Sequence, residues 1–217
     1  MFRVRALAIL IALGAPLIAA RPARAQDITL EIAVAPLAQQ RSAGPMFHQK
    51  GALDDADLRE RLSNGFPARL HFKSELWGIG NWFNRLESRF EWDVIIRYDP
   101  LEKVYAVFRA TEERVSVLGR FDRFADAQAA VEQPYRIPLV PKGRDRYYYI
   151  VRLEVETLSV SDLNEVESWL KGDFNPALRG DKGAGTAIGR GLRGIMLRLL
   201  GGERKQVETR SETFSPP

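Results

Sequence analysis

The sequence predicts a mainly β protein of α+β character: an antiparallel β-sandwich with about three short helices and a C-terminal basic amphipathic helix. Two observations predict this class. Apolar and polar residues alternate in about six segments, which is typical of strands that bury one face only. Helical spacings are brief, and the strand–helix rhythm of a parallel sheet is missing. Two half-buried sheets stacked face to face make a sandwich.

The composition fits one ordinary domain with an appendage. Of 217 residues, 45% are apolar and 28% are charged, which is enough to bury a core. The chain carries 32 basic and 28 acidic residues, and four of the basic ones but none of the acidic ones lie in residues 1–25. The remainder is therefore neutral and lacks a field that would steer it to nucleic acid. The absence of Cys excludes disulfides and thiolate catalysis.

Residues 1–25 read as a secretory signal peptide. Arg3 and Arg5 precede an apolar run over 6–20, and small residues precede the expected cleavage between Ala25 and Gln26. A membrane-spanning helix needs roughly 20 apolar residues, so this shorter run, interrupted by Gly and Pro, is not typical of one. We expect a soluble periplasmic protein, with peripheral membrane contact as a further option.

The first half of the mature chain begins with a strand at 28–34, where apolar residues occupy every second position. The segment 36–50 lacks a period and is expected to be a loop or the rest of a hairpin. A helix is predicted at 53–62, with Asp54 as its N-cap and Asn64-Gly65 after its end. The three Asp in its first turn suit the helix dipole better than a metal site.

Strands dominate the next hundred residues. The alternation predicts strands at 68–76, 90–98, 104–108, 115–117 and 147–158, with short helices at 122–132 and 162–172. Asp99-Pro100 predicts a turn that joins 90–98 and 104–108 into a hairpin.

After residue 172 the composition changes to a Gly-rich linker at 173–187, a basic amphipathic helix at 188–200 and a disordered tail at 201–217. The helix would present an apolar stripe beside a basic one; these are Ile188, Leu192, Ile195, Met196 and Leu199, and Arg190, Arg193 and Arg198. Such a helix can dock on its own domain, on an anionic membrane surface or on a protein partner. The sequence leaves these three open.

The order of motifs resembles a known family. The chain has Ser63-Asn64-Gly65-Phe66-Pro67 between helix and strand, then Tyr98-Asp99-Pro100-Leu101 with Tyr105, Phe121 and Phe124 before an Ala-rich helix, and Arg146-Tyr147-Tyr148-Tyr149 with Leu153. Together with the N-terminal signal, this pattern is similar to the DUF4390 family of exported bacterial proteins over roughly residues 27–172. The resemblance implies no activity, cofactor or catalytic residue.

Aromatic side chains are dense between residues 77 and 92. Phe90 and Trp92 share a strand face and are expected in the core. Trp77, Trp82 and Phe83 follow no clear period beside two glycines, so they are candidates for an exposed aromatic rim.

Catalytic motifs are weak throughout. Ser168 and Lys171 match a Ser-x-x-Lys pattern without its companion motif, and the glycines at 183–189 have the wrong spacing for a dinucleotide loop. His48 and His71 have no partner at metal-ligand spacing. We therefore expect no cofactor, metal or catalytic site, and an exported non-catalytic module that binds an envelope protein or peptide through a sheet face or edge. The alternative is an envelope glycan hydrolase that uses a carboxylate pair.

Overall fold

The computed structural model describes residues 28–157 and 205–217. The predicted signal peptide with its Ala25–Gln26 cleavage site, the helix at 162–172 and the tail helix at 188–200 lie outside these residues. In chain order the elements are β1 (Thr29–Ala33), the 3-10 helix η1 (Leu37–Gln39), β2 (Met46–Lys50), α1 (Ala56–Ser63), β3 (Ala68–Ile79), β4 (Arg85–Asp99), β5 (Val104–Thr111), β6 (Val115–Phe121), α2 (Phe124–Val131), β7 (Tyr135–Arg136), β8 (Arg146–Thr157) and β9 (Lys205–Arg210).

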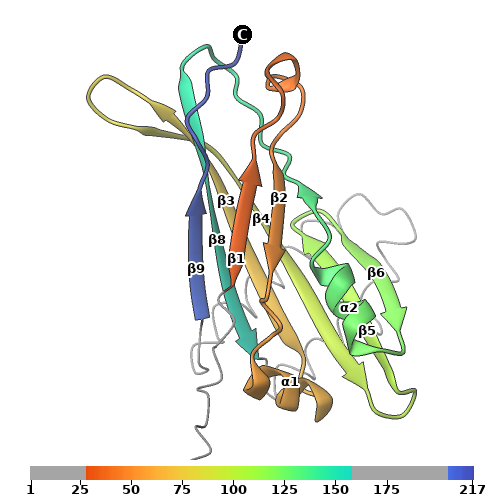
Figure 1. Ribbon diagram of the computed structural model, residues 1–217. Helices are drawn as coiled ribbons and strands as arrows, with labels where there is room; N and C mark the ends of the chain where they lie inside the picture. Colours follow the sequence, from red (N-terminus) through yellow and green to blue (C-terminus); the bar gives the residue numbers. More distant parts are fainter. Residues whose placement is uncertain (1–27, 158–204) are drawn as a thin grey trace, which may run out of the picture.

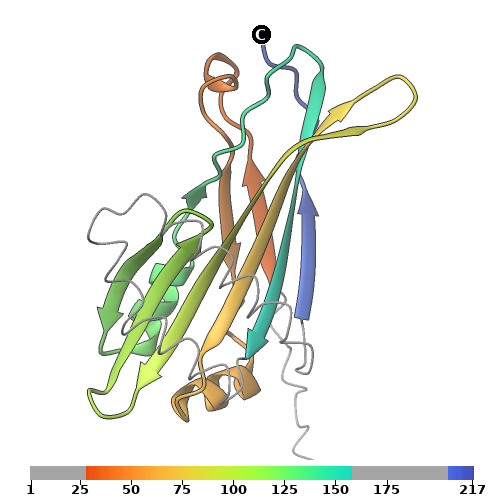
Figure 2. The same ribbon diagram turned by 180° about the vertical axis from the view of Figure 1, so that it is seen from behind.

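The strands form two antiparallel sheets. A six-stranded sheet has the order β6-β5-β4-β3-β8-β9, and a three-stranded sheet has the order β1-β2-β7. The smaller sheet and α2 lie over one face of the larger sheet, and Figure 2 shows the opposite face. We call these the inner and outer faces. The predicted mainly β class, with antiparallel sheets and short helices, is confirmed.

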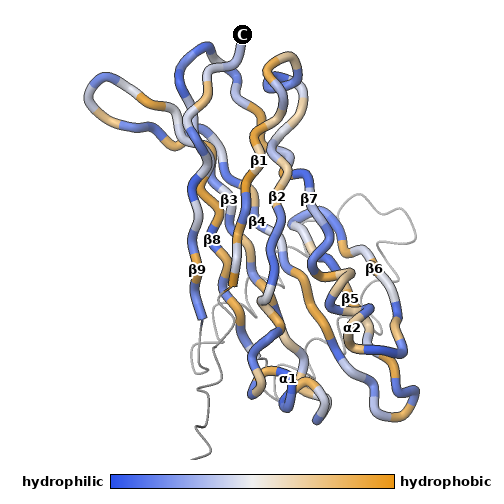
Figure 3. The backbone as a smooth tube through the Cα atoms, viewed as in Figure 1, coloured by the Kyte–Doolittle hydropathy of each residue, from blue (hydrophilic) through white to orange (hydrophobic). Residues whose placement is uncertain are grey.

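The core lies between the inner face and the smaller sheet. Hydrophobic and hydrophilic residues alternate along the strands in Figure 3, so each strand turns one side inward. Phe47 of β2 packs edge-on against Phe72 of β3 and Trp92 of β4, with ring centroids 5.5 and 5.8 Å apart. Beside them, the Arg109 guanidinium lies 4.3 Å from the Tyr135 ring centroid. Aromatic contacts therefore join the two layers.

A glycine permits the closest approach between two segments at the edge of the small sheet. A Cβ on Gly44 would lie 1.8 Å from the Ile137 carbonyl oxygen. The next residue, Pro45, accepts a hydrogen bond of 3.0 Å from the Ile137 amide through its carbonyl. Position 44 therefore needs a residue without a side chain.

The helix predicted at 53–62 is confirmed as α1, with one correction. Asp55, not Asp54, is its N-cap, and its carboxylate accepts hydrogen bonds from the amides of Asp57 and Leu58, both at 3.0 Å. The prediction misjudged the cap by one residue because adjacent Asp residues fit the cap pattern equally well.

Two other expectations about the chain are settled by strand pairing. The segment 36–50 is the rest of a hairpin, since β2 pairs with β1 from Met46 to Lys50. The prediction of a disordered tail at 201–217 is wrong for residues 205–217. There β9 pairs with β8 at the sheet edge, and Phe214 stacks on Tyr149 with ring centroids 5.2 Å apart. Five of the six β9 residues are polar or charged, so composition alone resembled disorder.

Candidate binding surfaces

The β3–β4 hairpin carries the most exposed aromatic side chains among the described residues. Its turn, residues 80–84, is called the hairpin tip below, and it projects past the body of the sheet in both views (Figures 1 and 2). Trp82 is 90% exposed and Phe83 is 86% exposed. Trp77 does not belong to the tip: it lies within β3 and is half-buried. Large exposed aromatics of this kind mark contact surfaces more often than chance.

The conformation of the tip is fixed by local contacts. A Cβ on Gly80 would lie 2.5 Å from the Phe83 carbonyl oxygen, so the turn is too tight for a side chain there. The Asn84 amide donates a 3.2 Å hydrogen bond to the Tyr148 hydroxyl of β8. These contacts fix the path of the backbone through the tip.

A cavity of about 690 Å³ lies at the base of the hairpin tip. It is lined by Phe83 and by two carboxylates, Glu87 of β4 and Asp145 from the turn before β8. Glu87 accepts hydrogen bonds from two nitrogens of Arg85, at 3.0 Å and 2.5 Å. The cavity therefore combines an aromatic ring with one paired and one exposed carboxylate.

The β6 strand forms a second candidate surface, because no described strand pairs with its outer edge. Its seven residues contain one charged residue, Arg120, and no proline. On the outer face, Ile95 pairs with Phe108, which pairs with Val117 at the edge. Ile95 is 2% exposed and Val117 is 64% exposed, so an apolar row begins in the sheet and ends in solvent.

A polar network occupies the middle of the outer face. Asp93 of β4 accepts hydrogen bonds from Arg69 Nε at 2.8 Å and pairs with His71 Nδ1 at 2.9 Å. Arg69 also reaches Glu156 of β8 at 3.3 Å. Arg69 and Asp93 are 5% and 3% exposed. Four charged or titratable side chains from three strands thus satisfy one another, as buried charges must.

Neighbouring charges on the same face follow the same rule. Glu75 receives hydrogen bonds from Lys73 at 2.7 Å and from the Trp77 indole at 3.0 Å. Burial raises the pKa of Glu75, but these two hydrogen bonds and the positive charges of Lys73 and Arg152 together hold the pKa below its ordinary value. Trp77 is therefore a hydrogen-bond donor within the sheet and not part of an exposed rim.

Within the described residues, the network lacks the parts of a hydrolytic site. In residues 28–157 and 205–217, no Ser, Thr or Tyr hydroxyl hydrogen-bonds to His71, so the His71–Asp93 pair has no nucleophile to activate. Over the same residues, no group of three or more His, Asp or Glu could hold a metal ion. His48 lies 4.0 Å from Glu31 at the surface of the small sheet, away from the network.

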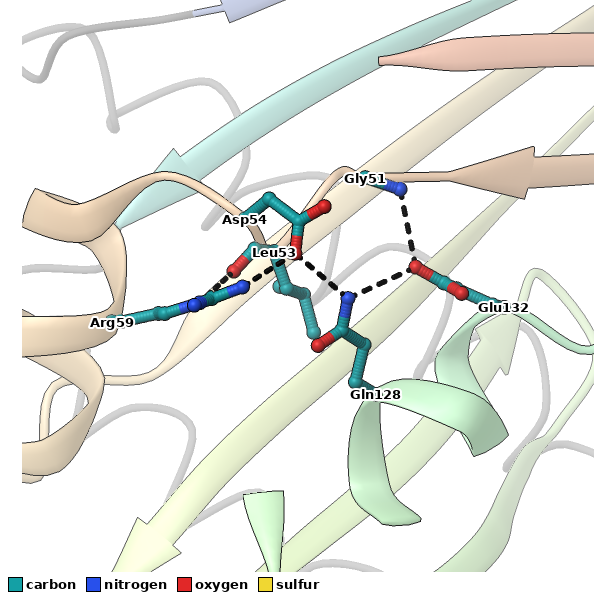
Figure 4. A network of polar contacts seen from close by, with 6 residues as sticks. All are labelled: Gly51, Leu53, Asp54, Arg59, Gln128 and Glu132. Atoms are coloured by element: carbon teal, nitrogen blue, oxygen red, sulfur yellow. Dashed lines mark hydrogen bonds and ion pairs between the residues drawn. The ribbon is translucent and has the colours of Figure 1, made fainter. Parts of the chain in front are cut away.

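The acidic turn before α1 is structural. Asp54 pairs with Arg59 and accepts a 3.0 Å hydrogen bond from Gln128 of α2, and Gln128 also donates to Glu132 at 3.1 Å (Figure 4). Glu132 in turn accepts from the Gly51 amide at 3.1 Å. The carboxylates therefore tie the start of α1 to α2 across 74 residues of chain.

Sequence reasoning identified the tip aromatics but missed the β6 edge and the buried network. One signal could have revealed the network. In β3, Arg69, His71 and Lys73 alternate with apolar residues, although the strand is buried on both faces. The edge had no such signal, because strand order depends on pairing between distant segments. The Ser168–Lys171 pair, the Gly-rich segment and all eight tail-helix residues lie outside the described residues.

No helix in the described ranges is long and apolar enough to cross a membrane. No curated protein and no solved structure matches the chain. The sequence model of one family, described as a domain of unknown function (DUF4390), matches residues 53–166, from before α1 to beyond β8. The match spans more than half of the chain and includes the hairpin tip and the β6 edge. The chain therefore belongs to the DUF4390 family.

Proposed function

We propose that this chain is an exported, non-catalytic protein of the cell envelope that binds a protein or peptide partner along the edge of β6. The observation that supports the proposal is the combination of an unpaired edge, among the described strands, with the exposed side chain of Val117. Export rests on the signal-like residues 1–25. An extended peptide can add a strand to such an edge through backbone hydrogen bonds.

The two edges of the large sheet differ in chemistry. Three of the six residues of β9 are charged, namely Lys205, Glu208 and Arg210, and charges on an edge discourage further pairing. The β6 edge carries Val115 and Val117 on its outer face instead. A strand added there would place an apolar side chain beside Val117 and extend the row from Ile95 and Phe108. The preferred partner segment is therefore extended and apolar at alternate positions.

Site-specific photo-crosslinking in cells tests this function. A photoreactive amino acid replaces Val117 on the β6 edge or, as the matched control, Gln206 on the β9 edge; both side chains are exposed. We expect one discrete protein adduct from position 117 and none from position 206. Absence of an adduct at 117, or the same adduct from both positions, would show that the β6 edge is not the binding surface.

The predicted tail helix at 188–200 belongs to the same proposal as a second contact, with a membrane surface or with its own domain. Its apolar stripe can contact only one of these two surfaces at a time. Replacing Leu192 and Ile195 with Ser removes the stripe without shortening the chain. A loss of vesicle binding would place the helix on lipid, whereas a loss of thermal stability would place it on its own domain.

Glycan hydrolysis is the second candidate function, because the cavity at the hairpin base holds Glu87 and Asp145 beside Phe83. Its weakness is that Arg85 already occupies the Glu87 carboxylate with two hydrogen bonds, so this carboxylate is not free to contact a glycosidic bond. If the cavity is catalytic, Glu87→Gln and Asp145→Asn each abolish release of soluble fragments from purified cell-wall glycan. If the wild-type protein releases none, this function is excluded.

A further inference from the structure

We propose that the hairpin tip docks on an anionic lipid surface through Trp82 and Phe83. This contact is separate from the β6 edge and from the predicted tail helix, and it goes beyond the proposed function. It rests on the shape of the tip, on its residue types and on the charges around it.

The shape of the tip suits a flat surface. The hairpin bends away from the sheet and ends in a convex turn (Figures 1 and 2), with Trp82 and Phe83 almost fully exposed. Two aromatic side chains offer roughly 300–500 Å² between them. A stable protein interface needs about 1,000 Å² or more in total. Insertion into a lipid interface has no such requirement, since each side chain is surrounded by lipid on its own.

The residue types of the tip suit the boundary between lipid and water. Trp is enriched at that boundary because its indole is apolar at one end and carries a hydrogen-bond donor at the other. The ten residues from Trp77 to Leu86 contain no Asp or Glu, so the tip itself carries no carboxylate that would have to leave water. The flanking Asn81 and Asn84 are polar and uncharged, as the headgroup region allows.

The charges beside the tip complement an anionic surface. Ile79, the last residue of β3, pairs with Arg146, so the turn before β8 lies next to the hairpin. That turn exposes Lys142 and Arg144, and the first residue of β8 exposes Arg146, against a single carboxylate, Asp145. Arg85 at the start of β4 is also exposed but pairs with Glu87, so the basic excess comes from the turn and the first residue of β8. A basic group near an anionic membrane contributes attraction that falls off within a Debye length.

The far end of β4 provides a natural comparison. Leu101, in the β4–β5 turn, is 92% exposed, which matches Trp82. Its charged neighbours are Asp99, Glu102 and Lys103, and Glu102 pairs with Arg120 of β6. An exposed apolar residue therefore sits at each end of β4, but the charges around Leu101 balance, whereas those around the hairpin tip have a basic excess. Only the basic end complements anionic lipid.

Vesicle co-sedimentation of the exported protein tests the inference. The vesicles consist of phosphatidylcholine alone or of phosphatidylcholine mixed with phosphatidylglycerol. We expect binding to the mixed vesicles that weakens as salt is raised. The double variant Trp82→Ser/Phe83→Ser should lower the affinity by at least about tenfold, because most of the apolar surface at the tip is removed. The exchanged variant Trp82→Phe/Phe83→Trp should retain it.

Two controls separate the contribution of the tip from that of the remaining apolar surfaces. Leu101→Ser removes an equally exposed apolar side chain at the opposite end of β4, which has no basic excess, and should leave the affinity unchanged. Leu192→Ser/Ile195→Ser removes the stripe of the predicted tail helix and measures its separate contribution. Unchanged circular dichroism and melting temperature confirm that the tip variant is folded. The inference is overturned if wild type and the Trp82→Ser/Phe83→Ser variant pellet equally, if neither binds, or if Leu101→Ser lowers the affinity as much.

Discussion

At the scale of single residues, Asp93 organises the outer face of the large sheet. Its carboxylate contacts both Arg69 and His71, and through Arg69 it is linked to Glu156 on β8. The network spans β4, β3 and β8 and replaces an apolar centre on that face. Buried charges of this kind hold a structure only while every partner is present.

Asp93→Ala should therefore lower the free energy of unfolding by about 3 kcal/mol, because Arg69 loses its closest partner while it stays buried. Urea denaturation measures the change. Arg123→Ala, which breaks an ion pair with Asp126 at the exposed start of α2, should cause little measurable change. Similar losses for the two variants would contradict a structural role for the buried network.

Tyr149 predicts a pH dependence at the residue scale. Burial raises the pKa of its hydroxyl, which donates a 3.0 Å hydrogen bond to the Leu139 carbonyl. In the unfolded chain Tyr loses its proton near pH 10, whereas the folded chain keeps it. The unfolded state therefore binds fewer protons above pH 10, so the free energy of unfolding falls there by up to about 1.4 kcal/mol per pH unit.

Tyr149→Phe isolates this effect. The variant loses one hydrogen bond, so it should be less stable at pH 8 by about 1 kcal/mol. The stability difference between wild type and variant should then shrink as the pH rises above 10. Thermal unfolding followed by circular dichroism across pH 8–11 measures it. A constant difference over this range would show that Tyr149 ionises equally in both states.

At the scale of elements, apolar periodicity predicted those helices and strands whose formation depends on residues close together in the sequence. Helix α1 and the β4–β5 hairpin follow from apolar spacing and from turn residues such as Asn64-Gly65 and Asp99-Pro100. Strand β9 could not be predicted in this way. Its residues become a strand because β8 offers an edge, and a 47-residue segment separates the two strands in sequence.

The C-terminal residues should contribute stability. Phe214 stacks on Tyr149, and its amide and carbonyl exchange hydrogen bonds with Tyr147 at 2.9 and 2.8 Å. Phe214→Ala should cost about 2 kcal/mol of unfolding free energy, less than a fully buried Phe because its ring is half-buried. Thr213→Ala, an exposed neighbour, is the control, and equal stability of the two variants in urea would contradict the packing role.

This packing also affects how the tail helix can be tested. A chain that ends at Gly172 lacks β9 and Phe214 as well as residues 188–200, so it exposes the edge of β8. Any change in binding would then mix loss of the helix with damage to the sheet. Point substitutions within the helix avoid this.

At the scale of the whole molecule, the candidate surfaces lie on different parts of one sheet. The hairpin tip lies where β3 and β4 extend beyond the sheet, whereas the β6 edge borders it on the side opposite β9. The sequence predicted exposed aromatics in the first, because Trp82 and Phe83 fit no strand period. It could not predict the second, because an edge exists only after strand order is known. Under the two proposals, the tip would contact a lipid surface while the β6 edge binds a protein partner.

The measurement that tests this most directly is recovery of the partner from envelope extracts with matched edge variants. Val117→Lys puts a charge on the β6 edge, and Gln206→Lys puts the same charge on the β9 edge; both positions are exposed, so the fold should be unaffected. We predict that wild type and Gln206→Lys recover the same protein in equal yield, and that Val117→Lys recovers none of it. Equal recovery by Val117→Lys, or no specific protein with the wild type, would contradict a binding function at the β6 edge.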